Sequence, residues 1–210
     1  MDLQMYLDQK IALVIFLVTI ATTFYALELN HQFFIDLALR PFYFFKHKQY
    51  ATVVTSGFLH ADFNHLLFNM LTFYFFAFEL EATMGSIPFL ILYFGALILS
   101  DIHTLIINKN NPQYLSIGAS GAITAVIFAS VLYDPNMGIY IFFIPIAIPA
   151  PIFAFIYIFV CIFLDKKDHT SNINHLAHLW GALSGIAITI ALDPPVFNYF
   201  LNNIDITTWF

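Results

Sequence analysis

The sequence predicts an all-α integral membrane protein that folds as one domain over residues 1–210. Two observations carry this prediction: 60% of the residues are hydrophobic and only 10% are charged, and the mean hydropathy is +0.82. The long apolar runs lack the alternation of a membrane β-strand. Because lipid offers no hydrogen-bond partners to the backbone, only helices and closed barrels span a bilayer, and these runs therefore favour helices.

Six long apolar runs predict six transmembrane helices, near residues 11–28, 64–80, 86–107, 117–133, 137–164 and 174–192. A helix needs roughly 20 residues to cross a hydrocarbon core about 30 Å thick. The first run has no small-residue cleavage signature, so we expect a retained span rather than a signal peptide.

The fifth run contains three prolines, Pro145, Pro149 and Pro151. A proline inside a helix removes one backbone hydrogen bond and its ring clashes with the preceding turn. We therefore expect the fifth helix to be kinked or loosely packed, which makes it a candidate gate.

The connection between the first two runs, residues 31–63, is rich in aromatic residues and carries Arg40, Lys46 and Lys48. Aromatic rings and long cationic side chains prefer the headgroup level of a bilayer. We interpret this connection as an interfacial loop that anchors the protein in the membrane, rather than as a binding site.

Charge and cysteine content exclude several classes of function. The net charge is −6, and seven Lys plus Arg leave no basic surface for nucleic acid. Cys161 is the only cysteine. An intrachain disulfide and a cysteine-based zinc site are therefore both excluded.

Polar residues open the second, fourth and sixth helices that the sequence predicts, namely His65, Ser120 and His178. In a chain with six spans these three helices run in one direction, so their first residues lie on the same side. Counting to the far end of each run gives about 20 Å in every case, which places the three side chains about 10 Å below one membrane face. Intramembrane ionisable residues usually face the bundle interior and serve a function.

The chemistry of these residues predicts a hydrolase. Serine is a weak nucleophile until a base accepts its proton, and histidine is the base best suited to neutral pH, so Ser120 and His178 form a candidate dyad. Free amides at the start of the fourth helix are candidate donors to an oxyanion. The side chains of His65 and Asn69 project from one helical face and are further candidate donors.

Small residues predict close contact between the fourth and sixth helices. Gly118 and Gly121 flank the serine, while Gly181 and Gly185 lie on the same helical face as His178. Small residues let the backbones of membrane helices approach closely. The glycines that permit this packing therefore also direct His178 toward the fourth helix.

Other interpretations of the same residues remain open. The small-residue segment around the serine is, on its own, typical of simple helix packing. His175 and His178, with His60 and His65 as further ligands, would suit a metal ion or a proton- or metal-coupled transporter. We otherwise interpret His60, His169 and His175 as structural or rim residues.

Five short motifs lie between about residue 50 and residue 190. They are Thr55-Ser56-Gly57-Phe58-Leu59-His60, His60-x4-His65-x3-Asn69, Glu81 with Gly85, Gly118-x-Ser120-Gly121, and Ala177-His178-x2-Gly181-x3-Gly185. Together they resemble the rhomboid family of intramembrane serine proteases. The resemblance covers most of the chain.

The resemblance implies a six-helix rhomboid bundle and a serine endopeptidase that cleaves the transmembrane segments of single-span membrane proteins within the lipid bilayer. It assigns Ser120 as the nucleophile and His178 as the general base, in a dyad without an orienting aspartate. It assigns His65 and Asn69 to the oxyanion. It implies no cofactor and no metal. An inactive rhomboid-like membrane-protein binder is the alternative.

Two features depart from the family pattern. Ala51 and Thr52 stand where many members carry Trp-Arg, and Thr124 stands where many carry an aromatic residue that stacks near the catalytic histidine. The orientation also conflicts: all basic residues except Lys10 lie on the active-site side, which predicts an inward-facing site. The resemblance implies a bacterial inner-membrane protein whose site faces outward, and we expect that orientation.

Overall fold

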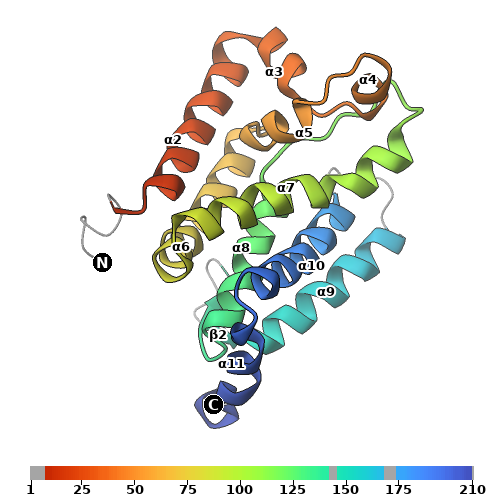
Figure 1. Ribbon diagram of the computed structural model, residues 1–210. Helices are drawn as coiled ribbons and strands as arrows, with labels where there is room; N and C mark the ends of the chain where they lie inside the picture. Colours follow the sequence, from red (N-terminus) through yellow and green to blue (C-terminus); the bar gives the residue numbers. More distant parts are fainter. Residues whose placement is uncertain (1–7, 142–145, 168–173, 210) are drawn as a thin grey trace.

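The computed structural model describes residues 8–141, 146–167 and 174–209. Its described part is mostly helical, and Figure 1 shows the arrangement. The elements in chain order are α2 (Lys10–Phe24), the π-helical turn η1 (Tyr25–Leu29), α3 (His31–Leu37), α4 (Pro41–Lys46), α5 (Thr52–Thr55), η2 (Ser56–Phe58), α6 (Phe63–Met84), α7 (Ser86–Asn108), α8 (Ser120–Tyr133), β1 (Gly138–Tyr140), β2 (Ala147–Pro149), α9 (Ala150–Lys167), α10 (His175–Leu192), α11 (Pro195–Asn203) and η3 (Ile206–Trp209).

Three helices in the described residues are long and apolar enough to cross a membrane: Lys10–Leu29, Ser86–Asn108 and His175–Leu192. Two shorter apolar helices cover Ser120–Tyr133 and Ala150–Asp165. The helix α6 has 22 residues, but its two asparagines, one histidine and two glutamates lower its hydropathy. The chain is therefore a multi-span helical bundle, while the count of six spans stays a prediction.

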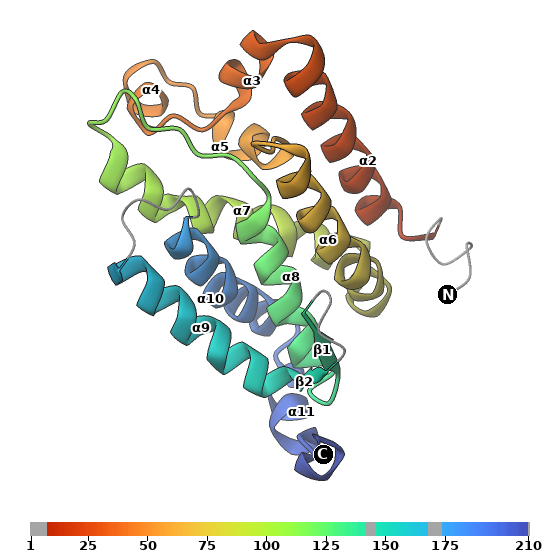
Figure 2. The same ribbon diagram turned by 180° about the vertical axis from the view of Figure 1, so that it is seen from behind.

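The helix α8 lies at the centre of the bundle. It packs against α6, α7 and α10, and most of its residues are buried. The helix α2 packs outside α6 and α9 packs outside α10, so these two helices lie at opposite edges of the bundle (Figures 1 and 2). A helix that is apolar on all sides is suited to a central position.

Glycines bring α8 and α10 into backbone contact. Gly181 lies against the carbonyl group of Gly121, and a Cβ added at Gly185 would lie 2.6 Å from the Cα of Ala125. These contacts pair residues in the same order along both helices, so α8 and α10 run parallel. This observation confirms the close packing that the small residues predicted.

The helix α7 packs antiparallel to α10. Gly95, in its first half, lies beside Ile188 near the end of α10. Ser100, further along α7, lies against Gly121 at the start of α8. The starts of α8 and α10 are therefore enclosed by the second half of α7.

The connection between α2 and α6 is a packed cap built from α3, α4, α5 and η2. Its apolar cluster consists of the buried residues Ala26, Phe34, Ala38 and Leu59. Leu39 and Ser116 exchange two backbone hydrogen bonds of 3.0 and 2.8 Å, which tie the cap to the segment that leads into α8. The interfacial position of this connection stays a prediction.

The apolar run 137–164 is not one helix, and the expectation of an all-α chain is wrong at this point. The strands β1 and β2 pair antiparallel, with Gly138 opposite Pro149 and Tyr140 opposite Ala147. The helix α9 begins only at Ala150. Apolar composition does not distinguish a short hairpin from the start of a helix, because both can lie against an apolar core.

The prolines Pro149 and Pro151, which predicted a kink in the fifth helix, lie outside the interior of α9. Pro149 ends β2, and Pro151 lies in the first turn of α9. A proline is tolerated there, because the amide it lacks would have no partner within the helix. Pro145 lies outside the described residues.

The three site-bearing helices are not equally long beyond their site residues, so the residue count on which the expected depth was based is wrong for α6. This helix continues to Met84, where Gly85 with φ +86° ends it. Its length from His65 to Met84 is roughly 28 Å, against about 20 Å from Ser120 to the end of α8. Whether the three site residues lie at one level therefore has to be judged from the contacts between their helices and not from residue counts.

The carboxylate of Glu81 ties the first helix to α6. It accepts hydrogen bonds from the backbone amides of Ile11 and Ala12, at 3.2 and 2.7 Å, and from the Ser86 hydroxyl at 2.5 Å. The residue Gln9 before α2 makes no side-chain cap. Glu81 therefore satisfies first-turn amides of α2, whose positive dipole end also favours a negative charge.

Candidate active site

Ser120 is the first residue of α8 and is partly exposed. The preceding turn depends on Gly118, whose φ of +110° favours glycine. The amide of Gly118 donates to the carbonyl of Ser56 at 3.0 Å, which fixes the turn against η2. The helical ladder starts at the amide of Ile123, which donates to the carbonyl of Ala119 at 2.9 Å.

His65 approaches the same turn from the first turn of α6. A Cβ added at Gly118 would lie 3.2 Å from Cε1 of His65, so the imidazole occupies the space that a side chain would need. The carboxylate of Asp62 caps α6 by accepting a hydrogen bond of 2.8 Å from the His65 amide. The structure thus brings His65 beside the turn that carries Ser120.

His178 lies in the first turn of α10, which packs on the start of α8. A Cβ added at Gly121 would lie 3.4 Å from the carbonyl oxygen of Ala177. The residue after the serine and the residue before the histidine are therefore neighbours. In the described chain no hydrogen bond joins the Ser120 hydroxyl to the His178 ring, and both side chains are partly buried.

Asn174 fixes the start of α10. Its side-chain oxygen accepts from the amide of Ala177 at 3.0 Å, and its amide nitrogen donates to the Thr104 hydroxyl of α7 at 2.6 Å. An asparagine cap followed by a hydrogen bond to a neighbouring helix holds the first turn in place. Asn174 and Thr104 were not among the residues predicted from the sequence, although asparagine is a common N-cap.

Asn69 lies one turn beyond His65 on α6 and is partly buried. Its amide nitrogen donates to the carbonyl of His65 at 3.0 Å. The structure therefore places Asn69 next to His65 on one helical face, and this hydrogen bond lies within its own helix rather than reaching Ser120. Its role at the oxyanion stays a prediction.

Tyr157 of α9 is the aromatic neighbour of His178. The two rings stack with centroids 6.4 Å apart and planes inclined by 19°. The Tyr157 hydroxyl lies 3.0 Å from the hydroxyl of Thr124, one turn after Ser120. Tyr157 could not be linked to the site from the sequence, because an aromatic residue in an apolar helix carries no spacing signal that points to a site.

The comparisons with known proteins place the chain in a family. The Rhomboid domain family matches residues 47–194, which include every predicted site residue. The chain belongs to the rhomboid family. It is similar to the putative rhomboid protease YdcA of Bacillus subtilis, with 30% identity over 149 residues that cover 65% of this chain and 64% of the relative.

A second relative of this rhomboid chain is RHOMBOID-like protein 12, mitochondrial, of Arabidopsis thaliana. Identity is 30% over 175 residues, which cover 73% of this chain and 49% of the relative. The rhomboid chain thus spans less than two thirds of the length of both relatives. The family includes serine proteases and consists of integral membrane proteins.

The histidines of the rhomboid chain do not form a metal cluster in its described residues, where no group of three or more His, Cys, Asp or Glu is placed to hold an ion. His60 is fully buried and its Nδ1 lies 3.2 Å from the Thr23 hydroxyl. Burial, and secondarily His65, lower the pKa of His60 to about 3, so its ring is neutral. His169 lies outside the described residues.

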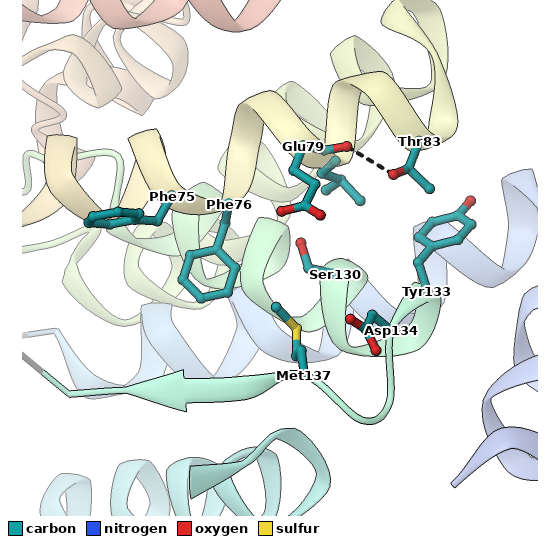
Figure 3. Close-up of a pocket in the computed structure, with 9 residues that line it drawn as sticks. Phe75, Phe76, Glu79, Thr83, Ser130, Tyr133, Asp134 and Met137 are labelled. Carbon is teal, nitrogen blue, oxygen red and sulfur yellow. Dashed lines mark hydrogen bonds between the residues drawn. The ribbon is translucent and has the colours of Figure 1, made fainter. Parts of the chain in front are cut away.

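A small pocket lies far from these residues, between the second halves of α6 and α8 (Figure 3). Its volume is about 100 Å³ and its lining includes Glu79, Ser130 and Asp134. Ser130 is roughly 15 Å along α8 from Ser120. The pocket is therefore separate from the candidate dyad.

Proposed function

We propose that this rhomboid protein is a serine endopeptidase that cleaves transmembrane segments of single-span membrane proteins. Ser120 is the nucleophile and His178 is the general base. The proposal is carried by the contact between the starts of α8 and α10, where Gly121 follows the serine and Ala177 precedes the histidine. This contact supports proton transfer between the two side chains, which needs them at one level of adjacent helices.

In the proposed reaction, Ser120 Oγ attacks the carbonyl carbon of the scissile peptide bond while His178 accepts the hydroxyl proton. His178 then returns that proton to the leaving amine, so that the C–N bond breaks and an ester with Ser120 remains. A water molecule, deprotonated by His178, hydrolyses the ester and regenerates the serine. Catalytic hydrogen bonds are often long without substrate, which makes the open Ser120–His178 geometry compatible with this scheme.

The oxyanion of each tetrahedral intermediate needs preorganised donors. Because the ladder of α8 starts at the Ile123 amide, the amides of Ser120 and Gly121 have no acceptor within the helix. His65 lies against the preceding turn and supplies a side-chain donor from α6. Asn69 has a second amide proton beyond the one it gives to His65. These groups support an oxyanion site at the start of α8.

We propose that the substrates reach this site within the bilayer and that the protein lies in a bacterial inner membrane with the site facing outward. Helical peptide bonds are hydrogen-bonded and shielded, so a substrate segment must unwind before Ser120 can attack it. The basic residues Arg40, Lys46 and Lys48 belong to the cap, which is hydrogen-bonded to the segment that leads into Ser120. In this proposal these basic side chains are numerous because they contact lipid headgroups, and not because their side of the protein faces the cytoplasm.

The test is labelling of the purified protein by a fluorophosphonate, which reacts with an activated serine. The wild type should be labelled and Ser120→Ala should not. His178→Ala should also lose labelling, because the Ser120 hydroxyl is then no longer activated. Ser130→Ala is the matched control, because that hydroxyl lies on the same helix and donates to the carbonyl of Val126. A chelator should leave the labelling unchanged.

An unlabelled wild type that also fails to cleave a single-span substrate would refute the proposal and favour an inactive membrane-protein binder. Labelling that persists in Ser120→Ala, or that Ser130→Ala removes, would place the reactive serine elsewhere. Inhibition by a chelator that added zinc reverses would favour a metal site on the histidines.

A further inference from the structure

Tyr157 joins three helices at the candidate dyad. It belongs to α9, its ring stacks on His178 of α10, and its hydroxyl contacts Thr124 of α8. The Thr124 hydroxyl also donates to the carbonyl of Ser120 at 2.8 Å. A threonine hydroxyl has one proton, so Tyr157 is the donor in its contact with Thr124. The result is a directed chain from the Tyr157 hydroxyl through Thr124 to the backbone of Ser120.

The Tyr157 ring is held by neighbours on two helices. Phe128 of α8 meets it edge-on, with centroids 5.7 Å apart, and Phe153 of α9 lies 5.6 Å away. Aromatic pairs at such distances restrict each other's rings. Tyr157 is therefore a fixed surface against which another ring can be oriented.

His178 has few other groups to orient its ring. Its backbone amide donates to the carbonyl of Asn174 at 3.3 Å, but that bond does not restrict the side chain. Within the described residues, the stacking with Tyr157 is the ring contact that fixes the plane of His178. In a three-residue serine protease site an aspartate orients the base, and among the described residues no aspartate forms a hydrogen bond with the His178 ring.

We propose that Tyr157 is a positioning residue for His178, and that Thr124 anchors Tyr157 to the backbone of the nucleophile. This inference rests on the proposed function. The stacking plane sets the direction in which a ring nitrogen of His178 faces Ser120. The hydrogen bond sets the height of the Tyr157 ring relative to Ser120.

The origin of Tyr157 in α9 has a further consequence. This helix lies at the edge of the bundle, where it packs mainly on α10 and less extensively on α8 (Figure 2). Any displacement of α9 moves the Tyr157 ring with it. The orientation of His178 is therefore coupled to the position of a peripheral helix, through one ring and one hydroxyl pair.

The experiment measures the fluorophosphonate labelling rate, and kcat and KM for a single-span substrate, in Tyr157→Phe, Tyr157→Leu, Thr124→Val and Thr124→Ser. Tyr157→Leu removes the stacking and should lower the labelling rate and kcat by about 3- to 10-fold, with little change in KM. Tyr157→Phe removes the hydrogen bond to Thr124 and should cost about 2- to 5-fold. Thr124→Val removes that bond together with the one to the Ser120 carbonyl, so its loss should be at least as large. Thr124→Ser keeps a hydroxyl and should recover most of the rate that Thr124→Val loses.

The Tyr157→Phe/Thr124→Val double variant separates coupling from independent damage. If Tyr157 acts through its hydrogen bond to Thr124, the double variant should be no slower than Thr124→Val alone. Phe155→Leu is the matched control, because Phe155 is on the same helix and is 75% exposed, so that the variant removes a ring without disturbing the core. Thermal unfolding in detergent identifies variants that fail to fold. If Tyr157→Leu does not fold, the comparison of Thr124→Ser with Tyr157→Phe still tests the inference.

Three outcomes would overturn the inference: wild-type labelling rates in Tyr157→Leu, an equal loss in Phe155→Leu, or a change confined to KM. Additive losses in the double variant would remove Thr124 from the role of anchor. A wild type that is neither labelled nor active would instead refute the proposed function. A labelled wild type with unaffected variants refutes only the positioning role.

Discussion

Replacing Gly181 by alanine should damage activity far more than stability. The added methyl group would overlap the carbonyl oxygen of Gly121 and lie 2.9 Å from its carbonyl carbon and Cα. Ordinary carbon contacts are about 3.5–4.0 Å, so α8 and α10 must separate by roughly 1 Å. Such overpacking costs about 1–3 kcal/mol, while the better helix propensity of alanine offsets about 1 kcal/mol.

The net loss of stability is therefore about 0–2 kcal/mol, and the protein should still fold. The separation, however, moves Gly121 and the adjacent Ser120 away from His178. A misplacement of about 1 Å can cost about 100-fold in rate. We expect the labelling rate per folded molecule to fall by about that factor.

The assay combines thermal unfolding in detergent with the rate of fluorophosphonate labelling. Gly95→Ala in α7 is the matched control: the nearest atom to its methyl group is the terminal Cδ1 of Ile188, at 3.1 Å, which can rotate away. This variant should match the wild type in both measurements. The reasoning is refuted if Gly181→Ala labels as fast as Gly95→Ala, because the backbone contact would then not position the dyad.

Three further predictions concern the oxyanion, the first helix and the substrate. Asn69→Ala should lower turnover by about 100- to 1000-fold, the typical loss for one oxyanion donor, and unchanged turnover would reduce Asn69 to a packing residue. Glu81→Ala leaves two first-turn amides of α2 without their acceptor and should lower the free energy of unfolding by about 1–3 kcal/mol. The labelling rate per folded molecule should stay unchanged, and an unchanged melting temperature would contradict this capping role. A single-span substrate with a Gly-Pro pair near the cut should be cleaved faster than the same substrate with Leu-Leu, since unwinding is then easier, and equal rates would exclude unwinding as the limiting step.

Much of the candidate site could be predicted from the sequence because its members lie at helix starts. The polar residues His65, Ser120 and His178 stand out where apolar runs begin, and the structure places all three in the first turns of α6, α8 and α10. The rhomboid resemblance is confirmed by the family match. The roles of these residues in catalysis stay predictions.

The hairpin and the end of α6 could not be predicted in the same way. The apolar composition of residues 137–164 shows only that this segment has apolar surroundings. A strand, a turn and a helix that face an apolar core all have such a composition. The end of α6 depends on the positive φ of Gly85, whereas the hydropathy declines several residues earlier. Counting apolar residues therefore placed this helix end too early.

The sequence by itself determined which segments are apolar enough to favour lipid, because hydropathy is a property of each segment alone. It also determined which helices can touch, because only glycine leaves room for a backbone at Gly181 and Gly185. Only the tertiary structure decided what surrounds the candidate dyad. Thr124 lacks the aromatic ring expected at its position, and the ring comes instead from Tyr157, which is 33 residues away in the chain. Contacts over such separations depend on how complete helices pack, and no local spacing in the sequence encodes them.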